Sequence, residues 1–255
     1  MLNKVKTLKG YKLNCIDGEI GKVKEFYFED HNWTIRYLIA DTGNWLVGKQ
    51  VLISPYALNG LNNEDLYIVI NLTKNQIENS PFLASDKPIS RLYEEDCCSY
   101  YEWPAYWGNP NLGVTGGLYP IIANGQNHEK LMESESTQGD KDLDTHLRST
   151  HELSGYTSHA TDGEIGHVED FIIDYETLEI RYLVISTMNW WPGKKILISP
   201  KWIERVSWKE SEVFVNLIRE TIKQSPEYTE DSLITRDYES KLHQHYNQQG
   251  YWIDE

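Results

Sequence analysis

Short segments in which apolar and polar side chains alternate run through the chain and predict β-strands. In its first third, the stretches rich in β-branched and aromatic residues are 20–28, 34–41, 49–53 and 66–70. Turn-forming pairs such as Asp17-Gly18 and Asn59-Gly60 separate them. Several short strands with turns between them predict a small antiparallel β-barrel or β-sandwich.

After the last of these strands the pattern becomes helical. A short helix is expected at 74–79, where Ser80-Pro81 ends it, and a second helix at about 90–101. Ser90 stands at the N-cap position of the second helix, where a hydroxyl can accept a backbone hydrogen bond. We therefore expect the barrel to be followed by a short helical tail rich in aromatic residues.

The whole pattern occurs twice, at a constant offset of 145 residues and without a gap. Asp-Gly-Glu-Ile-Gly occurs at 17–21 and 162–166, Ile-Arg-Tyr-Leu at 35–38 and 180–183, and Leu-Ile-Ser-Pro at 52–55 and 197–200. Each copy has about 100 residues, a normal size for a domain and too long for the period of a solenoid. The chain is therefore predicted to be mainly β, with two tandem barrels.

The segment between the copies has a different composition. Residues 108–150 contain few apolar side chains and many Gly, Ser, Asp and Glu, so they cannot bury enough surface to offset the entropy lost on ordering. We predict a flexible linker at 108–150. Repeat one, with its tail, is then 1–107, and repeat two, with its tail, is 151–255.

Composition and charge exclude several classes of protein. No run of about 18 apolar residues is present, so membrane insertion is not expected. The net charge of −15, without a basic stripe, argues against nucleic-acid binding. Three cysteines are too few for a disulfide framework and favour a reducing compartment. We predict an acidic, cytoplasmic protein.

The repeated turn and strand motifs at 17–21, 35–38 and 52–55 resemble those of the PRC-barrel domain, and their duplication is similar to bacterial proteins with two tandem PRC-barrel domains. The resemblance covers the chain except for the linker. It implies a small, strongly bent β-barrel in each repeat. Because that family serves mainly in adaptors and assemblies, it also implies a binding function, connected with stress or with the assembly of a complex.

Repeated carboxylates are the first candidates for chemistry, since paired carboxylates can act as acid and base. Asp17 and Glu19, with Asp162 and Glu164, flank a glycine in a tight turn, where Asp bonds local backbone amides. We favour this structural role over catalysis. The glycines expected to supply unusual backbone conformations in these turns are Gly18, Gly21, Gly163 and Gly166.

Arginines and large aromatic residues also recur. We expect Arg36 and Arg181 to form structural ion pairs with a repeated carboxylate such as Glu19 or Asp17. Aromatic side chains in loops are enriched at interfaces, and packing over the end of a barrel is the alternative. The interaction candidates are Trp45, Trp190, Trp191, Tyr106, Trp107, Tyr251 and Trp252. We predict that the tails contact the other repeat or a partner rather than only their own barrel.

Two groups of residues support a different function. The vicinal Cys97 and Cys98 could respond to redox conditions, and His243 with His245 could bind a metal. His245 has Tyr100 as its counterpart in repeat one, and no Cys-x-x-Cys or His-Glu-x-x-His motif accompanies either group.

The sequence thus leaves two hypotheses. The first is a non-enzymatic scaffold or adaptor module, without cofactor or resident metal, that binds an unidentified protein partner. Its repeats are expected to pack as a pseudo-two-fold pair, or the chain to form a homodimer. The alternative is a protein that responds to a small ligand, a metal or redox conditions through the cysteine or histidine groups.

Overall fold

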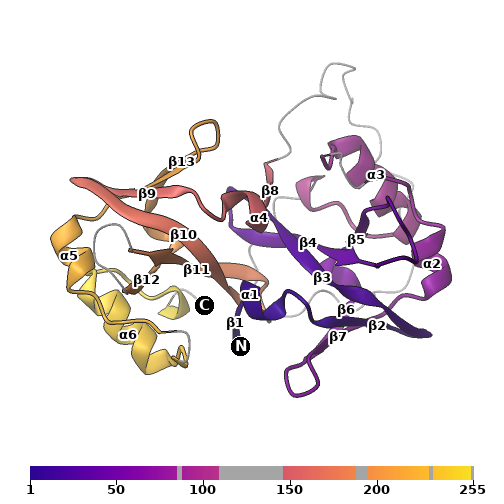
Figure 1. Cartoon of the computed structure of the whole chain (residues 1–255), viewed down its shortest axis with the longest axis horizontal. Coiled ribbons are helices and arrows are strands. Elements are labelled where there is room, and N and C mark those ends of the chain that lie inside the picture. Colours follow the sequence, from indigo (N-terminus) through magenta and orange to yellow (C-terminus); the bar gives the residue numbers. More distant parts are fainter. Residues whose placement is uncertain (85–87, 109–145, 188–193, 230–231, 254–255) are drawn as a thin grey trace.

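The computed structural model describes residues 1–84, 88–108, 146–187, 194–229 and 232–253. Two β-rich units lie side by side along the long axis of the molecule (Figure 1). We call the described residues up to 108 the first unit and those from 146 onward the second unit. No helix in the described ranges has the length and apolar character needed to cross a membrane.

The first unit contains seven strands and three α-helices with two 3-10 turns. In chain order these are β1 (Leu2–Lys4), α1 (Val5–Leu8), β2 (Lys12–Cys15), β3 (Gly18–Glu29), β4 (Thr34–Asp41), β5 (Val51–Ile53), η1 (Pro55–Ala57), β6 (Leu58–Asn62), β7 (Tyr67–Ile70), α2 (Lys74–Glu78), α3 (Arg91–Tyr101) and η2 (Tyr106–Gly108). The strands predicted at 20–28, 34–41, 49–53 and 66–70 are confirmed. The Ser90 cap is also confirmed, because its hydroxyl accepts a hydrogen bond from the backbone N–H of Tyr93 at 3.3 Å.

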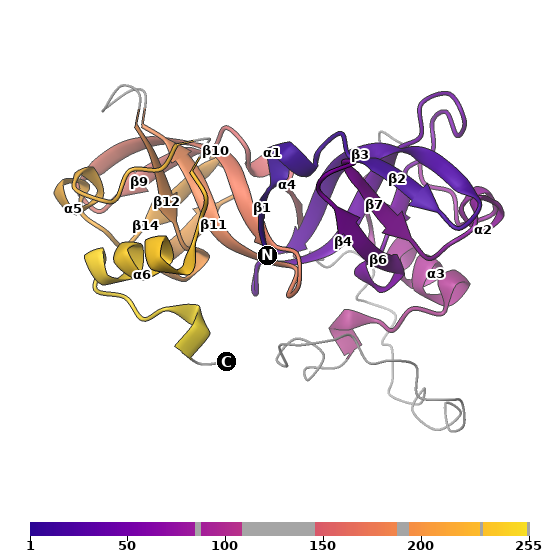
Figure 2. The same cartoon turned by 90° about the horizontal axis from the view of Figure 1, so that it is seen from below.

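The second unit repeats this order. Its elements are β8 (Leu147–Ser149), α4 (Thr150–Leu153), β9 (Thr157–Ala160), β10 (Gly163–Asp174), β11 (Glu179–Ser186), β12 (Lys195–Ile198), η3 (Pro200–Trp202), β13 (Ile203–Ser207), β14 (Glu212–Val215), α5 (Arg219–Lys223), α6 (Arg236–His245) and η4 (Tyr251–Ile253). Helices α3 and α6 lie on the same side of the sheet, each against the strands of its own unit (Figure 2).

The strands form one continuous mixed sheet rather than two separate antiparallel barrels. Its order is β13-β14-β9-β10-β11-β4-β3-β2-β7-β6, and the sheet does not close. The prediction of purely antiparallel pairing is wrong, since β2 pairs with β7, and β9 with β14, in parallel. Four intervening strands make these connections long enough for parallel pairing.

The two units join where β4 meets β11. Thr34 pairs with Glu179, and two equivalent backbone bonds flank this pair, from Ile35 N to Leu178 O at 2.7 Å and from Ile180 N to Trp33 O at 2.8 Å. Unpaired strand edges expose backbone donors and acceptors, so joining two edges satisfies groups that each unit alone would leave open.

The units also exchange strands. β1 pairs with β10 of the second unit, and β8 pairs with β3 of the first unit. These pairings are equivalent under the offset of 145 residues. Each unit therefore contributes one short strand to the sheet of the other. Residues 147–150, which we assigned to the linker, are therefore ordered in β8 and the start of α4. The rest of the predicted linker, 109–145, lies outside the described residues.

One hydrophobic core extends through both units. It includes Val5 and Leu8 of the exchanged segment, and Phe28 of β3 lies 6.5 Å from Phe171 of β10, centroid to centroid. A second cluster of buried residues, including Tyr37, Tyr93 and Cys97, lies under α3. Since apolar burial is the main favourable term in folding, the shared core couples the stability of the two units.

Candidate functional site

The repeated aspartates hold helix N-termini. Oδ1 of Asp17 accepts a hydrogen bond from the backbone N–H of Lys74, the first residue of α2, at 2.8 Å. Asp162 does the same for Arg219, the first residue of α5, at 2.8 Å. A carboxylate at this position satisfies a backbone donor that the helix leaves unpaired. The geometry supports the structural role for both aspartates.

The glycines beside these aspartates adopt left-handed conformations. Gly18 has φ of +134° and Gly163 of +141°, and the φ angles of Gly21 and Gly166 are +140° and +135°. Gly21 also lies very close to the backbone of β4, because a Cβ at this position would be 2.0 Å from the carbonyl oxygen of Asp41. Gly21 therefore permits both the backbone conformation and the close approach of β3 to β4.

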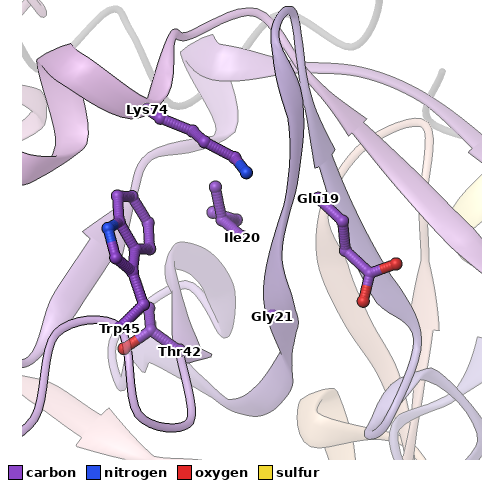
Figure 3. A pocket seen from close by; sticks show the side chains of 6 residues that line it. All are labelled: Glu19, Ile20, Gly21, Thr42, Trp45 and Lys74. Carbon is purple, nitrogen blue, oxygen red and sulfur yellow. The ribbon is translucent and has the colours of Figure 1, made fainter.

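An open pocket of about 300 Å³ lies beside this turn in the first unit (Figure 3). Its lining residues are Glu19, Ile20, Gly21, Thr42, Trp45 and Lys74. The ammonium of Lys74 lies 6.0 Å from the centre of the Trp45 ring. The carboxylate of Glu19 points away from both and pairs with Lys12 at 3.0 Å. The pocket thus offers a cation and an aromatic face to a ligand from outside.

Chain segments next to the pocket residues carry exposed apolar side chains. The exposed fractions are 66% for Ile16, 37% for Trp45, 77% for Val47 and 69% for Phe82. The loop after β4 is joined to the segment that carries Phe82 by a backbone bridge between Lys49 and Ala84. We call Ile16, Trp45, Val47 and Phe82 the α2-end surface. Trp190 and Trp191 of the second unit lie outside the described residues.

The repeated arginines form ion pairs, but with other carboxylates than Glu19 or Asp17. Arg36 pairs with Glu29, with Nε at 3.1 Å from Oε2. Arg181 pairs with Glu179 and lies 3.8 Å from Asp174. On β3 and β4 these side chains are neighbours across the strands, whereas Glu19 lies at the far end of β3.

Each arginine also stacks on the tyrosine of its own tail. The guanidinium carbon of Arg36 is 4.4 Å from the ring centre of Tyr106, and that of Arg181 is 3.8 Å from Tyr251. The tail tryptophans are held in the same way, Trp107 by Arg91 at 4.1 Å and Trp252 by Arg236 at 4.4 Å. The tails therefore pack on their own units, where the arginines provide a cation–π surface, and contact of the tails with a partner stays a prediction.

A buried glutamate beneath each tail was missed by our sequence analysis. Glu239 of α6 is 2% exposed, and its Oε1 accepts from the hydroxyls of Tyr182 at 2.9 Å and Tyr251 at 2.8 Å. Arg236 lies 3.2 Å from its other oxygen. In the first unit Glu94 accepts from Tyr106 at 2.8 Å and pairs with Arg91 at 3.0 Å. The signal was present, since Tyr93-Glu94 recurs as Tyr238-Glu239.

Glu94 should make stability depend on pH. Burial raises the pKa of its carboxyl above the ordinary value of 4.5, against the opposing effect of Arg91. A carboxyl with a raised pKa binds its proton more tightly in the folded chain, so its contribution to stability is present at low pH and is lost as pH rises through that pKa. The stability of Glu94→Gln relative to wild type should therefore increase as pH rises from 4.5, in urea unfolding at several pH values.

The exposed neighbour Glu95 gives the matched control for this experiment. Glu95→Gln removes a carboxyl from the exposed side of the same helix and so controls for the loss of one acidic group outside the buried network. A difference between Glu94→Gln and wild type that does not change with pH would contradict the raised pKa.

The cysteines of α3 and the histidines of α6 are surrounded by other residues of the fold. Cys97 is buried, and burial raises the pKa of the Cys97 and Cys98 thiols to about 11, which disfavours the reactive thiolate. His243 lies within 3.0 Å of the Tyr182 hydroxyl, and His245 Nε2 contacts the carbonyl of Thr221 at 2.7 Å. The two imidazoles have different partners, so they do not form a joint site. Cys98 and His243 occupy equivalent positions in the two units.

Comparison with known proteins finds a similarity for one part of the chain. A search of curated proteins found no match. The family model of the PRC-barrel domain matches residues 158–222, from β9 to α5. This span contains Asp162, Gly163, Gly166 and Arg181. A second PRC-barrel domain in residues 1–107 and a bacterial origin stay predictions from the repeated motifs. Residues 158–222 of the second unit are thus similar to the PRC-barrel domain.

Proposed function

We propose that this chain is a non-enzymatic adaptor that binds a protein partner through the α2-end surface of its first unit. The observation that supports it most directly is a pocket with an indole face and a lysine ammonium, next to chain segments that carry further exposed apolar side chains. Contiguous exposed apolar patches mark sites of protein interaction more often than single exposed residues do. A partner segment with apolar and acidic side chains would complement this surface.

The difference between the units supports this choice of surface. At the positions equivalent to Ile16 and Phe82, the second repeat has Thr161 and Glu227. Two of the four positions of this surface are thus polar in the second repeat, which is also the more acidic of the two. We infer that the first unit provides the partner contact, while the second unit stabilises it through the shared core and exchanged strands.

The remaining chemistry fits a binding role. The repeated aspartates cap helices, the arginines stack on the tails, and the thiol pKa values of Cys97 and Cys98 are raised. The aspartates and arginines therefore have structural contacts, and the raised thiol pKa values disfavour the reactive thiolate. The cytoplasmic location and a PRC-barrel domain in each repeat belong to the same proposal.

Affinity capture followed by reconstitution tests this function. The full chain, used as bait in an extract of its native cell, should retain a protein that binds saturably when purified. The double variant Val47→Asp with Phe82→Asp, and separately Trp45→Ala, should weaken that binding at least about tenfold, as hot-spot residues do. The control is Leu233→Asp, an exposed leucine of the second unit, which should bind normally.

Equal binding by the α2-end variants would show that the partner docks elsewhere. Retention of a small molecule or a nucleic acid, with no bound protein, would contradict the adaptor function itself.

A further inference from the structure

Two histidines and an aspartate meet at the junction of the units. Asp30 and His31 lie in the turn between β3 and β4, and His146 immediately precedes β8. Oδ1 of Asp30 is 3.0 Å from Nδ1 of His146 and 3.6 Å from Nδ1 of His31. One ligand atom from each of the three residues lies within 4.8 Å of the others. His146 is 116 positions from Asp30 in sequence and is brought to Asp30 and His31 by the exchange of β8.

The backbone fixes this arrangement. The N–H of Asp30 donates to the carbonyl of His146 at 2.9 Å, and the next residues, Glu29 and Leu147, are partners in the β3–β8 ladder. Nε of Arg148 donates to Oδ2 of Asp30 at 3.1 Å. This contact leaves Oδ1 directed toward the imidazoles. A charged neighbour that orients a ligating carboxylate is a common feature of metal sites.

The fold itself does not require these three side chains. In the second unit the equivalent backbone bond joins Tyr175 N to Met1 O at 3.0 Å. The same scaffold there carries Met1, Tyr175 and Glu176 in place of His146, Asp30 and His31. The combination of two imidazoles with a carboxylate is therefore specific to the first unit's junction and not a consequence of the duplicated architecture.

We propose that Asp30, His31 and His146 bind a divalent transition-metal ion, with Zn²⁺ as the best fit. Zinc accepts imidazole and carboxylate ligands at about 2.0–2.2 Å in a tetrahedral arrangement, which requires donor atoms only slightly more than 3 Å apart. Imidazole ligands favour Zn²⁺, Cu²⁺ or Ni²⁺ over Mg²⁺ and Ca²⁺, which need several oxygen ligands.

Solvent can reach the site, since the side chains of His31 and His146 are 60% and 46% exposed while Asp30 is 12% exposed. Three protein ligands leave a fourth position for water or a partner's side chain. The bound ion would tie the β3–β4 turn to the segment that enters the second unit. By joining residues far apart in the chain, it would stabilise the folded state and the exchange of β8.

The test uses the metal-free full chain and ZnCl₂. Calorimetric titration should give one Zn²⁺ per chain at this site, and Zn²⁺ should raise the melting temperature as its concentration exceeds Kd. His31→Asn and His146→Asn should each weaken binding at least about tenfold, the scale seen even for residues that only support a ligand. Asn suits position 146 because it tolerates the positive φ of 55° there.

His151→Asn is the matched control, since His151 is exposed and lies outside the cluster. It should bind Zn²⁺ like the wild type. Melting without metal must be the same for all variants, and His31→Asn carries the test if His146→Asn does not fold. Absence of Zn²⁺ binding by the wild type, or equal binding by the double variant His31→Asn with His146→Asn, would overturn the proposal.

Discussion

Replacing Gly21 by alanine is expected to lower the free energy of unfolding by about 2–5 kcal/mol. Two effects add at this position. The φ of +140° strains any residue with a Cβ, and that Cβ would lie 2.0 Å from the Asp41 carbonyl oxygen, closer than any real contact. Either β3 and β4 separate there or the turn changes conformation. Urea unfolding followed by circular dichroism measures the loss.

Gly60 separates the two effects, because its φ is +138° but nothing lies within 4 Å of a Cβ built there. Gly60→Ala should therefore cost only the strain of the backbone, about 1–3 kcal/mol. The equivalent glycine of the second unit, Gly166, should behave like Gly21, since its Cβ would lie 1.9 Å from Ser186 O. Similar losses for Gly21→Ala and Gly60→Ala would show that the close approach of the strands has no energetic importance.

Removing the Glu239 side chain is expected to have a comparable effect. Glu239→Ala should lower the free energy of unfolding by about 3–5 kcal/mol, the usual cost of deleting one member of a buried charged network. The hydroxyls of Tyr182 and Tyr251 would both lose the Oε1 acceptor. A cavity would remain between α6 and the strands, so the tail at η4 should detach at lower denaturant concentrations.

Two further variants show whether the loss of stability in Glu239→Ala comes from its hydrogen-bond network or from a general effect on helix α6. Glu239→Gln keeps the shape and an acceptor oxygen, so it should cost less than Glu239→Ala. The exposed Asp237 of the same helix pairs with Lys241 at its surface, and Asp237→Ala should cost no more than about 1 kcal/mol. A loss for Glu239→Ala as small as that for Asp237→Ala would mean that the buried carboxylate contributes little to stability.

Glu94 and Glu239 both lie in tails that we expected to contact another repeat or a partner. A barrel needs only its inward-facing residues to fill itself, so the extra aromatic residues suggested another surface. The structure provides that surface within the same unit, through Arg36 under Tyr106 and Arg181 under Tyr251. An arginine pattern in one strand does not reveal which aromatic ring, 70 residues later in each unit, lies above it.

The sequence by itself determined the duplication, the main strands, the Ser90 helix cap and the special role of the repeated glycines. Those features depend on neighbours within a few residues, where alternation, turn chemistry and capping act directly. Asp17 was expected to bond backbone amides of its own turn, whereas its carboxylate accepts from Lys74, 57 positions later, and this helix could not be identified from the turn alone.

Only the tertiary structure decided how the two copies combine. The single sheet depends on the pairing of Thr34 with Glu179, and the exchange of β1 and β8 brings His146 to Asp30. Both contacts join positions more than 100 residues apart. Their formation depends on which strand edges remain open and on the total apolar surface buried, and these are properties of the assembled chain. A local sequence pattern therefore does not predict them.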